Sequence, residues 1–566
     1  MPGSGGSGPA GWSAERSSAG HHNPWLIASV ISISSFMEVL DTSVANVSLR
    51  HIAGGLSASY DEATWVLTTY LVANAIIIPI SGWLSETLGR KRYYVLSVAC
   101  FTLASGACGI APSLSFLIGA RIVQGMAGGG LQPVTQAMLI DSFPPEKRGQ
   151  SLAVFGLTLI LAPAIGPLLG GLITDRFSWH WIFLINVPIG VVALSLVQSL
   201  VSEPAKLRQE RRERLSRGLQ FDGMGFLLIA AGLGALEITC DRGEREDWFA
   251  SQFILTSAIV SGVALVAFVI WEVRRREPVL DMHLFGHRNF SIAVGLIMLT
   301  GVIMYGTTQF IPQLLQEVMG YTAASAGLAL TAGGIATLVA MPFAGLLSDK
   351  VQPRFLIAGA LAFEAFALWE MTHLNTNMSF RDATWARVWQ AFPIPFLFIP
   401  LTNAAYVGLA PDRSNQASAL LNVARNLGGS IGISLVQTFI SHREQFYQSR
   451  QVETLNPLNP SYRYGLDQMT HALIAQGLSA AQAGESAVGV LYRSLQRQAS
   501  MLAYLDTFWI LMIFSLIVLP VVLWMKSTPS VGASRAAAQR RSRRRPPGRG
   551  GHMPPVAREA PSGGHA

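Results

Sequence analysis

Windows of apolar residues that hold almost no charge recur along the chain. Each is about twenty residues long, enough to cross a bilayer as a helix. A single large soluble core would not need so many uninterrupted runs, so the pattern predicts an all-α membrane protein with fourteen transmembrane helices. We place these helices near residues 25–48, 63–84, 93–111, 115–138, 151–173, 181–201, 224–240, 252–272, 290–311, 325–347, 354–373, 387–409, 417–440 and 504–525.

The first window carries two carboxylates, Glu38 and Asp41, in an otherwise uncharged run over residues 25–49. A charged carboxylate at bilayer depth costs several kcal/mol unless it is paired, so it is rarely retained there without a function. Glu38, Asp41 and Thr42 fall on one helical face because they are three and four residues apart. We expect this face to line a bundle interior or a water-filled cavity, and to help a proton and a solute through the protein.

Charged residues are few and unevenly placed. They make up 13% of the 566 residues, against about 25% in ordinary soluble domains. The net charge of +8 could indicate nucleic-acid binding. However, the basic clusters lie on alternate connections between the windows, which is the positive-inside pattern of membrane proteins. We therefore expect both termini in the cytoplasm and no nucleic-acid partner. The clusters are at residues 90–92, 147–148, 206–217, 274–276 and 350.

The two ends of the chain differ in composition from the windows. Residues 1–23 are rich in glycine and serine and lack the charged start and apolar core of a signal peptide, so we expect a disordered tail. Residues 527–566 are rich in arginine, proline and glycine, and we expect a second disordered tail. This basic tail would fix topology and attract anionic lipid, or else bind a specific partner. Between the tails we place an N-terminal bundle at 24–202, a linker with an inserted helix pair at 203–285, and a C-terminal bundle at 286–526.

The two halves of the membrane region echo each other in sequence. The loop motif that begins at Gly82 returns at Gly345, 263 residues later, and the Ala-Arg-x-x-Gln motif around Arg121 returns around Arg387, 266 residues later. Ordered matches at a nearly constant offset indicate that a six-helix unit was duplicated, with the helix pair 224–272 inserted between the copies. Secondary transporters use such duplication to build a substrate site at the interface of the halves that can open to either side.

The repeated loop also carries a family resemblance. Residues 82–91 read Gly-Trp-Leu-Ser-Glu-Thr-Leu-Gly-Arg-Lys and resemble the cytoplasmic loop signature of the major facilitator superfamily. The resemblance implies that the glycines allow a tight turn and that the charged residues form a network closing the cytoplasmic side. Here Glu replaces the more usual Asp, and Thr87 replaces a usual Arg; a solvated turn is the alternative. The implied gate residues are Gly82, Glu86, Gly89, Arg90 and Asp349.

Arg121 lies within the fourth window, in a segment similar to the intramembrane arginine motif of the same superfamily. The resemblance implies a part in proton coupling. A buried guanidinium needs an acceptor, and its field favours the charged form of a nearby carboxylate. We expect Arg121 to tune the acidity of Asp41, with Glu38 sharing the same face. Pairing of Arg121 with backbone carbonyls at helix ends is the alternative.

The fifth window reads Leu-Ala-Pro-Ala-Ile-Gly-Pro-Leu-Leu-Gly-Gly over residues 161–171 and resembles the antiporter-specific motif of the superfamily. Its prolines remove helix hydrogen bonds and its glycines permit close helix packing. The resemblance implies a tight seal that prevents leak during exchange, which favours antiport, although a plain packing kink would use similar residues. The residues concerned are Pro163, Gly166, Pro167, Gly170 and Gly171.

The chain is identified as a member of the fourteen-span drug:proton antiporters and most resembles the EmrB-type members, over nearly all of residues 25–526. Besides the opening helix, segments 181–190, 241–248 and 421–430 carry the match. The first-helix motif usually ends in Ala-Leu-Pro, whereas here it reads Ser-Leu-Arg, and Glu38 is an extra acid.

Further polar residues lie at membrane depth. Glu364 stands between aromatic residues in the middle of a window, a setting that suits an amphiphilic cation; a satisfied pair inside the bundle is the alternative. Asp506 starts the last window, where the family often has an acid, and interfacial hydration is the alternative. The substrate-binding candidates are Glu364, Asn422, Arg425 and Asp506.

These features predict a proton-driven antiporter that exports amphiphilic or cationic drugs and toxic compounds across the bacterial inner membrane by alternating access. An exporter of a physiological metabolite, such as a siderophore or lipid-like compound, is the nearer alternative, and a non-transporting receptor or enzyme is the more distant one. The sequence has no metal-ligand spacing, nucleophile motif or phosphate loop. We therefore expect no metal, no cofactor and no enzymatic activity, with an ion gradient as the energy source.

The segment 441–503 is long, polar and compatible with helices. By resemblance to EmrB-type members, we expect it to dock a periplasmic adaptor protein and, through the adaptor, an outer-membrane channel. A passive cap on the bundle is the alternative.

Overall fold

The computed structural model of the chain describes residues 23–143, 147–201, 205–216, 221–275, 278–406, 409 and 414–525. Apart from Asn23, the predicted tails at 1–23 and 527–566 lie outside these residues. The described residues form helices and contain no strand, which confirms the all-α prediction.

The N-terminal half contains the first six predicted spans. The fourth span is broken near Gly129, because Pro133 cannot donate a hydrogen bond to the carbonyl four residues before it. The helices are α2 (Pro24–Val47), α3 (Leu49–Gly55), α4 (Tyr60–Leu88), α5 (Arg90–Cys108), α6 (Leu114–Gly128), α7 (Leu131–Ser142), α8 (Arg148–Arg176), α9 (Trp181–Leu184) and α10 (Asn186–Leu200).

Local sequence sets where these helices begin. Asn23 accepts a hydrogen bond from the backbone N–H of Trp25 at 3.0 Å, and Pro24 supplies the first residue of α2. Ser59 and Glu62 form a capping box at the start of α4. These caps satisfy backbone donors that lipid could not.

The C-terminal half repeats the six-span arrangement. A break between α17 and α18, at Pro393, falls close to the place that corresponds to the α6–α7 break. The helices are α14 (Arg288–Gln313) with the π-helical turn η5 (Leu314–Val318), α15 (Ala323–Lys350), α16 (Pro353–Met371), α17 (Phe380–Ala391), α18 (Ile394–Tyr406), α19 (Ser414–Val452) and α21 (Ala480–Leu523).

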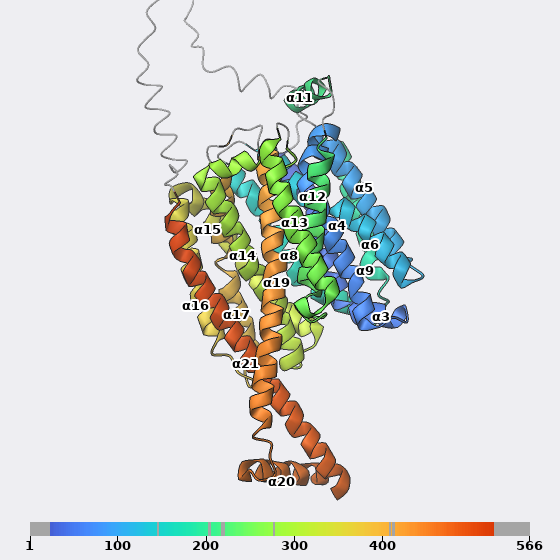
Figure 1. Cartoon of the computed structure of the whole chain (residues 1–566), viewed down its shortest axis with the longest axis vertical. Helices are drawn as coiled ribbons and strands as arrows, with labels where there is room; N and C mark the ends of the chain where they lie inside the picture. The colour runs from blue at the N-terminus through green and yellow to red at the C-terminus, as the bar shows by residue number, and fades with distance from the viewer. Residues whose placement is uncertain are drawn as a thin grey trace, which may run out of the picture.

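An inserted helix pair joins the halves and packs against both of them. It consists of α12 (Gly223–Arg242) and α13 (Gln252–Arg274), with α11 (Ala205–Ser216) and η3 (Trp248–Ala250) before and between them, and η4 (Met282–Gly286) after them. In Figure 1, α12 lies between α4 and α19, and α13 packs against α12. Asp241 of α12 accepts a hydrogen bond from Thr68 of α4. Glu237 accepts from Ser430 of α19 at 2.8 and 3.0 Å. Buried polar contacts therefore connect α12 to each half.

The number of membrane segments depends on how polar a span is allowed to be. Ten described helices are long and apolar enough to cross a membrane, and the bent α8 makes up to eleven. Three further segments, α5, α16 and the α17–α18 pair, are more polar but pack against other helices of the bundle, for example α5 against α6 and α16 against α21. With them, the described chain holds the fourteen predicted segments.

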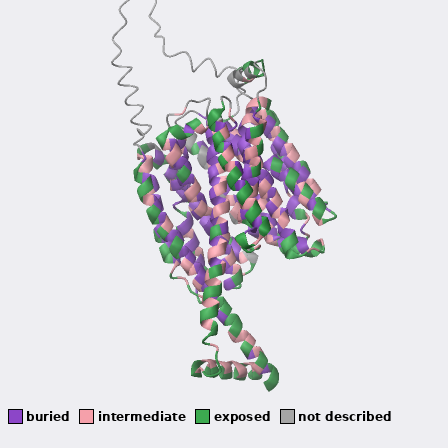
Figure 2. Cartoon of the chain, viewed as in Figure 1, coloured by how far each residue is buried: buried purple, intermediate pink, exposed green. Residues whose placement is uncertain are grey.

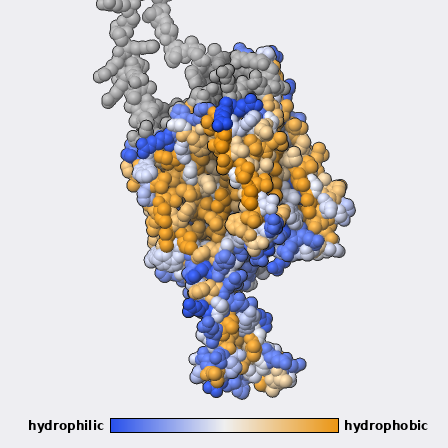
Figure 3. All heavy atoms as spheres, viewed as in Figure 1, coloured by the Kyte–Doolittle hydropathy of each residue, from blue (hydrophilic) through white to orange (hydrophobic). Residues whose placement is uncertain are grey.

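The surface is that of a protein solvated by lipid. Figure 2 shows buried residues along the inside of the bundle, and Figure 3 shows hydrophobic residues over its sides with hydrophilic residues at its ends. Leu103, Val263 and Ile517 are 75%, 65% and 64% exposed. Water would make such exposure costly, whereas acyl chains do not. The protein is therefore a multi-pass membrane protein.

The last two long helices extend well beyond the bundle. The 39 residues of α19 and the 44 of α21 correspond to lengths of about 60 Å and 65 Å, at about 1.5 Å per residue. A bilayer core is about 30 Å thick. The predicted windows 417–440 and 504–525 are thus only parts of longer helices, which continue from lipid into water without a break. The helix α20 (Pro460–Ala475) lies across the tip, away from the bundle (Figure 1).

Both described chain ends lie at the same end of the bundle. The ring of Trp25, at the start of α2, contacts Phe143 at 5.0 Å, next to α7. Figure 1 shows α21 rising from the projection to the opposite end of the bundle, where α11 also lies. Arg211 of α11 donates to the carbonyl of Thr87, in the last turn of α4. The chain ends therefore share a side with the basic loops, opposite the projection.

Candidate functional site

The carboxylate of Asp41 is at the centre of a buried hydrogen-bond cluster. Asp41 is 2% exposed and Arg121 is fully buried. Arg121 of α6 forms an ion pair with Asp41 Oδ2. Gln124 Nε2 donates to Asp41 Oδ1 at 2.9 Å, and Asn186 Nδ2, at the start of α10, donates to the same oxygen at 2.7 Å. Three helices, α2, α6 and α10, therefore converge on one side chain.

The guanidinium of Arg121 is held from several sides. Its Nε donates to the carbonyl of Val66 at 3.1 Å, and its Nη1 donates to Gln124 Oε1 at 2.9 Å. The rings of Tyr70 and Phe183 lie 4.1 and 5.5 Å from the guanidinium carbon. A buried ion pair needs such extra contacts because desolvating two charges can cost more than their attraction contributes. The alternative prediction is that Arg121 pairs with backbone carbonyls. Among these contacts, only the one with the carbonyl of Val66 is of that kind.

Glu38 shares a helix face with Asp41 but has different surroundings. It is 4% exposed, and its Oε1 accepts a hydrogen bond from Asn74 of α4 at 3.0 Å. Arg425 and Tyr305 of the C-terminal half interact with it electrostatically. Asp41 is thus enclosed by the N-terminal half, whereas Glu38 faces the interface between the halves.

Glu364 belongs to a second polar cluster, in the C-terminal half. It is 1% exposed, in α16. Gln390 Nε2 donates to Glu364 Oε1 at 2.9 Å and to Thr307 Oγ1 at 3.0 Å. Arg387 donates to Gln390, and also to Thr308 at 3.4 Å. The alternative prediction, a satisfied pair inside the bundle, therefore holds for Oε1 of Glu364, whose partner is the amide of Gln390.

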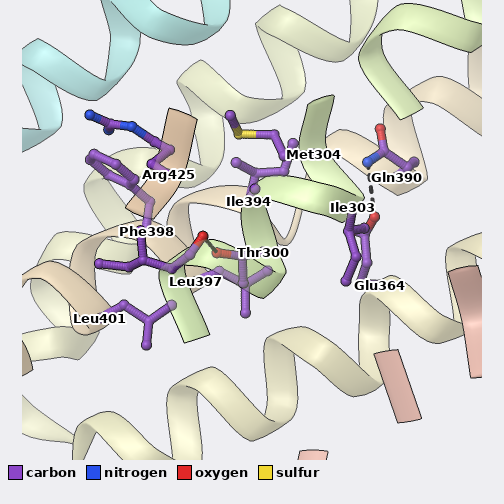
Figure 4. Close-up of a pocket in the computed structure, with 12 residues that line it drawn as sticks. Thr300, Ile303, Met304, Glu364, Gln390, Ile394, Leu397, Phe398, Leu401 and Arg425 are labelled. Carbon is purple, nitrogen blue, oxygen red and sulfur yellow. Dashed lines mark hydrogen bonds between the residues drawn. The ribbon is translucent and has the colours of Figure 1, made fainter. Parts of the chain in front are cut away.

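A small cavity lined by residues of the C-terminal half extends from Glu364 to Arg425. Figure 4 shows Glu364 and Gln390 at one side of it and Arg425 with Phe398 at the other. Its volume is about 40 Å³, and most of the lining is apolar. That volume is enough for a few water molecules, at about 10–15 Å³ for each.

Two substrate-binding candidates meet at the interface itself. Asn422 Nδ2 donates to Gln136 Oε1 of α7 at 3.0 Å, a hydrogen bond between the two halves. Arg425 donates to Asn422 Oδ1 and lies over the ring of Phe398 at 5.5 Å. The structure therefore brings Asn422, Arg425 and Glu364 to one region.

Asp506 lies elsewhere. Its Oδ2 accepts hydrogen bonds from Arg443 Nε at 2.5 Å and from the Tyr447 hydroxyl at 2.8 Å, both on α19. It does not line the cavity. The helix α21 begins at Ala480, so Asp506 lies within a helix that extends beyond the predicted window 504–525. In this structure Asp506 ties α21 to α19 near the base of the projection.

The loop between α4 and α5 is fixed by a partner that the sequence motif did not indicate. Arg90 forms an ion pair with Asp141, at the end of α7. Gly89 has φ of 93°, in the left-handed region that favours glycine, so the tight turn implied by the motif is present.

The remaining gate candidates lie at the ends of the two repeated helices. Gly82 is buried in α4, and Glu86 is half-buried in its last turn. Asp349 lies in α15, but its side chain is outside the described part of the chain. A role of these residues as a gate stays a prediction.

The proline and glycine motif bends α8. Its segments 154–163 and 165–176 meet at 43°, as expected where Pro163 and Pro167 remove helix hydrogen bonds. Pro167 is buried and Gly171 half-buried.

The glycines of this motif pack against the helix that carries Asp41. A Cβ atom at Gly166 would overlap the side chain of Ser43, and one at Gly170 would lie 3.2 Å from the carbonyl oxygen of Val44. Both contacted residues directly follow the Asp41 turn of α2. The motif therefore fixes how closely α8 approaches the buried carboxylate.

Several polar partners were absent from the predicted site. One signal for them was available, because Gln124 and Gln390 each follow the repeated arginine by three residues. A second was the position of Asn186 in an apolar run, where an amide needs partners. The partners missed are Asn74, Gln124, Gln136, Asp141, Asn186, Thr307 and Gln390.

Comparisons with known proteins agree with this architecture. The profile of the Major Facilitator Superfamily matches residues 31–433. The chain is 37% identical over 506 residues to the multidrug export protein EmrB of Escherichia coli strain K12, covering 89% of this chain and 95% of that protein. It is 33% identical to the fatty acid resistance protein FarB of Neisseria gonorrhoeae, covering 89% and 96%.

A solved structure supports the fold independently. The proton:xylose symporter XylE matches with a TM-score of 0.54 at 13% identity, covering 91% of this chain and 98% of that one. At that identity the likeness concerns the fold alone. The chain is thus a transporter and not an enzyme, and it belongs to the major facilitator superfamily, in the group of EmrB-type members.

Proposed function

We propose that this protein exchanges protons for amphiphilic toxic compounds and exports them across the bacterial inner membrane, with Asp41 as the main proton site. The observation that supports this most is the buried cluster of Asp41, Arg121, Gln124 and Asn186. A charged carboxylate at this depth needs every one of these donors. Its protonation weakens the contacts that hold α2, α6 and α10 together, so proton binding changes the relative stability of helix arrangements.

Alternating access requires the interface near Glu364 to open. A drug-sized ligand needs a pocket of about 300–1,000 Å³, whereas the cavity here has about 40 Å³. The halves must therefore separate, which breaks the Asn422–Gln136 hydrogen bond. Glu38 and Glu364 would then face the opened space and attract a cationic substrate. Protonation from the outer side would release it.

The relatives' names support this substrate class and also favour a second one. One relative is a multidrug export protein and another a fatty acid resistance protein. Arg425 lines the cavity and would suit the carboxylate of a lipid-like acid. Export of such a compound is the second candidate function, and a substrate panel that includes fatty acids separates the two.

The replacement Asp41→Asn tests the proton assignment. Asparagine has nearly the same shape and cannot titrate, so efflux driven by an imposed pH gradient in proteoliposomes should be lost, while insertion and downhill dye exchange remain. Asp175→Asn is the matched control, because the Asp175 side chain is 72% exposed at the end of α8. Gradient-driven efflux that survives in Asp41→Asn would refute the assignment.

The projection of α19, α20 and α21 is proposed to dock a periplasmic adaptor. The supporting observation is its shape, since it stands away from the bundle and α20 has no buried residue. This argues against a passive cap. Replacing residues 453–479 by a short Gly-Ser linker should abolish resistance in cells while dye transport in proteoliposomes continues. Full resistance with the shortened projection would exclude docking through α20.

The proposed orientation places the chain ends in the cytoplasm and the projection in the periplasm. Its support is the basic character of the loops at the end of the bundle where the described chain ends lie. A single cysteine in place of the exposed Leu458, on the projection, should react with an impermeant maleimide in intact cells. A single cysteine in place of Lys91 should react only after the cells are lysed. The reverse labelling would overturn the orientation.

A further inference from the structure

The C-terminal half carries a modified copy of the Asp41 cluster. Residue 387 lies 266 residues after Arg121, and Gln390 lies 266 after Gln124. An offset of 266 takes Asp41 to Thr307, whereas the offset of 263 of the loop motif takes it to Met304, so the hydrogen bonds decide which residue corresponds. Gln390 donates to Thr307 as Gln124 donates to Asp41, at 3.0 and 2.9 Å. The amide and its partner position were thus retained in the second half, but the acid at that position was not.

A carboxylate from another helix takes up the role of the missing acid. Glu364 comes from α16, the third span of its half, whereas Asp41 comes from the first span of the other half. The same Gln390 amide nitrogen that contacts Thr307 also donates to Glu364, at 2.9 Å. An arginine, an amide and an acid therefore meet in both halves, but the acid comes from the first span in one half and from the third span in the other.

The two clusters differ in how completely the acid is bonded. Both oxygens of Asp41 accept hydrogen bonds. Glu364 Oε2 is buried and accepts none within the described part of the chain. An unsatisfied buried carboxylate oxygen is costly, so it favours a proton or a cation beside it.

The surroundings of Glu364 allow such a guest to reach it. Glu364 lines the cavity that extends to Arg425. The charged groups that face it are Arg387, from α17, and Arg425, across the cavity on α19. Neither makes a direct ion pair with Glu364 among the described contacts. Within the described contacts, Glu364 is therefore hydrogen-bonded to Gln390 but not held in an ion pair.

We propose that Glu364 is a second proton-exchanging carboxylate, which holds a proton or the substrate cation in turn, so that one transport cycle exchanges two protons rather than one. The inference rests on the proposed function, because it needs Asp41 to supply the first proton. As the cation arrives, the O–H bond of Glu364 breaks and the proton passes to water; as the cation leaves, water returns a proton and the O–H bond re-forms.

The proton:substrate ratio tests this in proteoliposomes of the full chain with ethidium, an amphiphilic monocation, as the probe. The ratio follows from the ethidium concentration gradient at which net ethidium flux stops for a fixed pH gradient, with the membrane potential clamped at zero. The wild-type chain should give two protons per ethidium and Glu364→Gln one, with slower ethidium flux because the variant also loses the charge that attracts the cation. Glu370→Gln, on the exposed face of the same helix, should leave the ratio at two. An unchanged ratio in Glu364→Gln overturns the inference.

A second variant separates loss of a proton site from loss of structure. Thr307→Asp combined with Glu364→Gln returns the acid to the position that corresponds to Asp41, so the ratio should return to two. Proton release on ethidium binding to detergent-solubilised protein gives an independent reading, with two protons for the wild-type chain and one for Glu364→Gln. Release of one proton by both proteins contradicts the inference. Absence of any proton coupling in the wild-type chain would instead contradict the proposed function itself.

Discussion

The ion pair between Asp41 and Arg121 should behave as one unit in a double-mutant cycle. Asp41→Asn leaves a buried guanidinium without its counter-charge, and Arg121→Gln leaves a buried carboxylate. Both side chains are inaccessible to water in the structure, and breaking a buried pair by removing one partner costs about 3–5 kcal/mol. The double variant leaves no unpaired charge. Its destabilisation should therefore be close to that of one single variant, giving a coupling energy of about 3–5 kcal/mol.

The assay is reversible unfolding of the purified protein in mixed micelles, followed for the wild-type chain, both single variants and the double variant. Mutations at independent sites add to within about 0.3–0.5 kcal/mol, so the expected coupling is well above that error. A cycle on Asp175 and Arg121 serves as the control and should be additive, because the exposed Asp175 makes no contact with Arg121. Additive destabilisation by Asp41→Asn and Arg121→Gln would refute the cluster as described.

Two further predictions concern the helix contacts around the site. Gly166→Leu should force α8 away from Ser43, destabilise the fold by about 1–3 kcal/mol and increase proton leak in liposomes. Gly262→Leu is the control, because a Cβ atom there meets open space, and it should change neither stability nor leak. Equal leak in the two variants would speak against the proposed seal. Arg90→Asp should lower the rate of dye transport. Adding Asp141→Arg should restore most of that rate, because the ion pair is rebuilt with its charges exchanged. A double variant no faster than the single one would show that transport does not depend on this ion pair.

The sequence predicted the elements of this protein well because a membrane imposes a simple local rule. Every backbone polar group in lipid must be satisfied within a helix or barrel, so each span is readable from its own residues. The two exceptions are informative. The windows 417–440 and 504–525 ended where hydrophobicity ended, but α19 and α21 continue because polar residues can extend a helix into water.

The candidate site was predictable only where it depended on one helix or on the repeat. The spacing of Glu38 and Asp41 placed both on one inward face, and the structure buries both. Helical spacing could not show that Asp41 is enclosed by its own half while Glu38 faces Arg425, since that depends on how α2 is rotated against α4, α6 and α19. The contact of Arg121 with Asp41 is present, while its role in proton coupling stays a prediction.

By itself, the sequence determined the spans, the duplication, the family and the acids retained at membrane depth, because each of these leaves a local or periodic trace along the chain. The tertiary structure alone decided which groups those acids meet. Asp41 finds Asn186, 145 residues away, Glu364 shares Gln390 with Thr307, and Asp506 turns to Arg443 instead of the cavity. Such partners come from helices that pack side by side while being distant in sequence, and the free energy that selects them belongs to the assembled bundle.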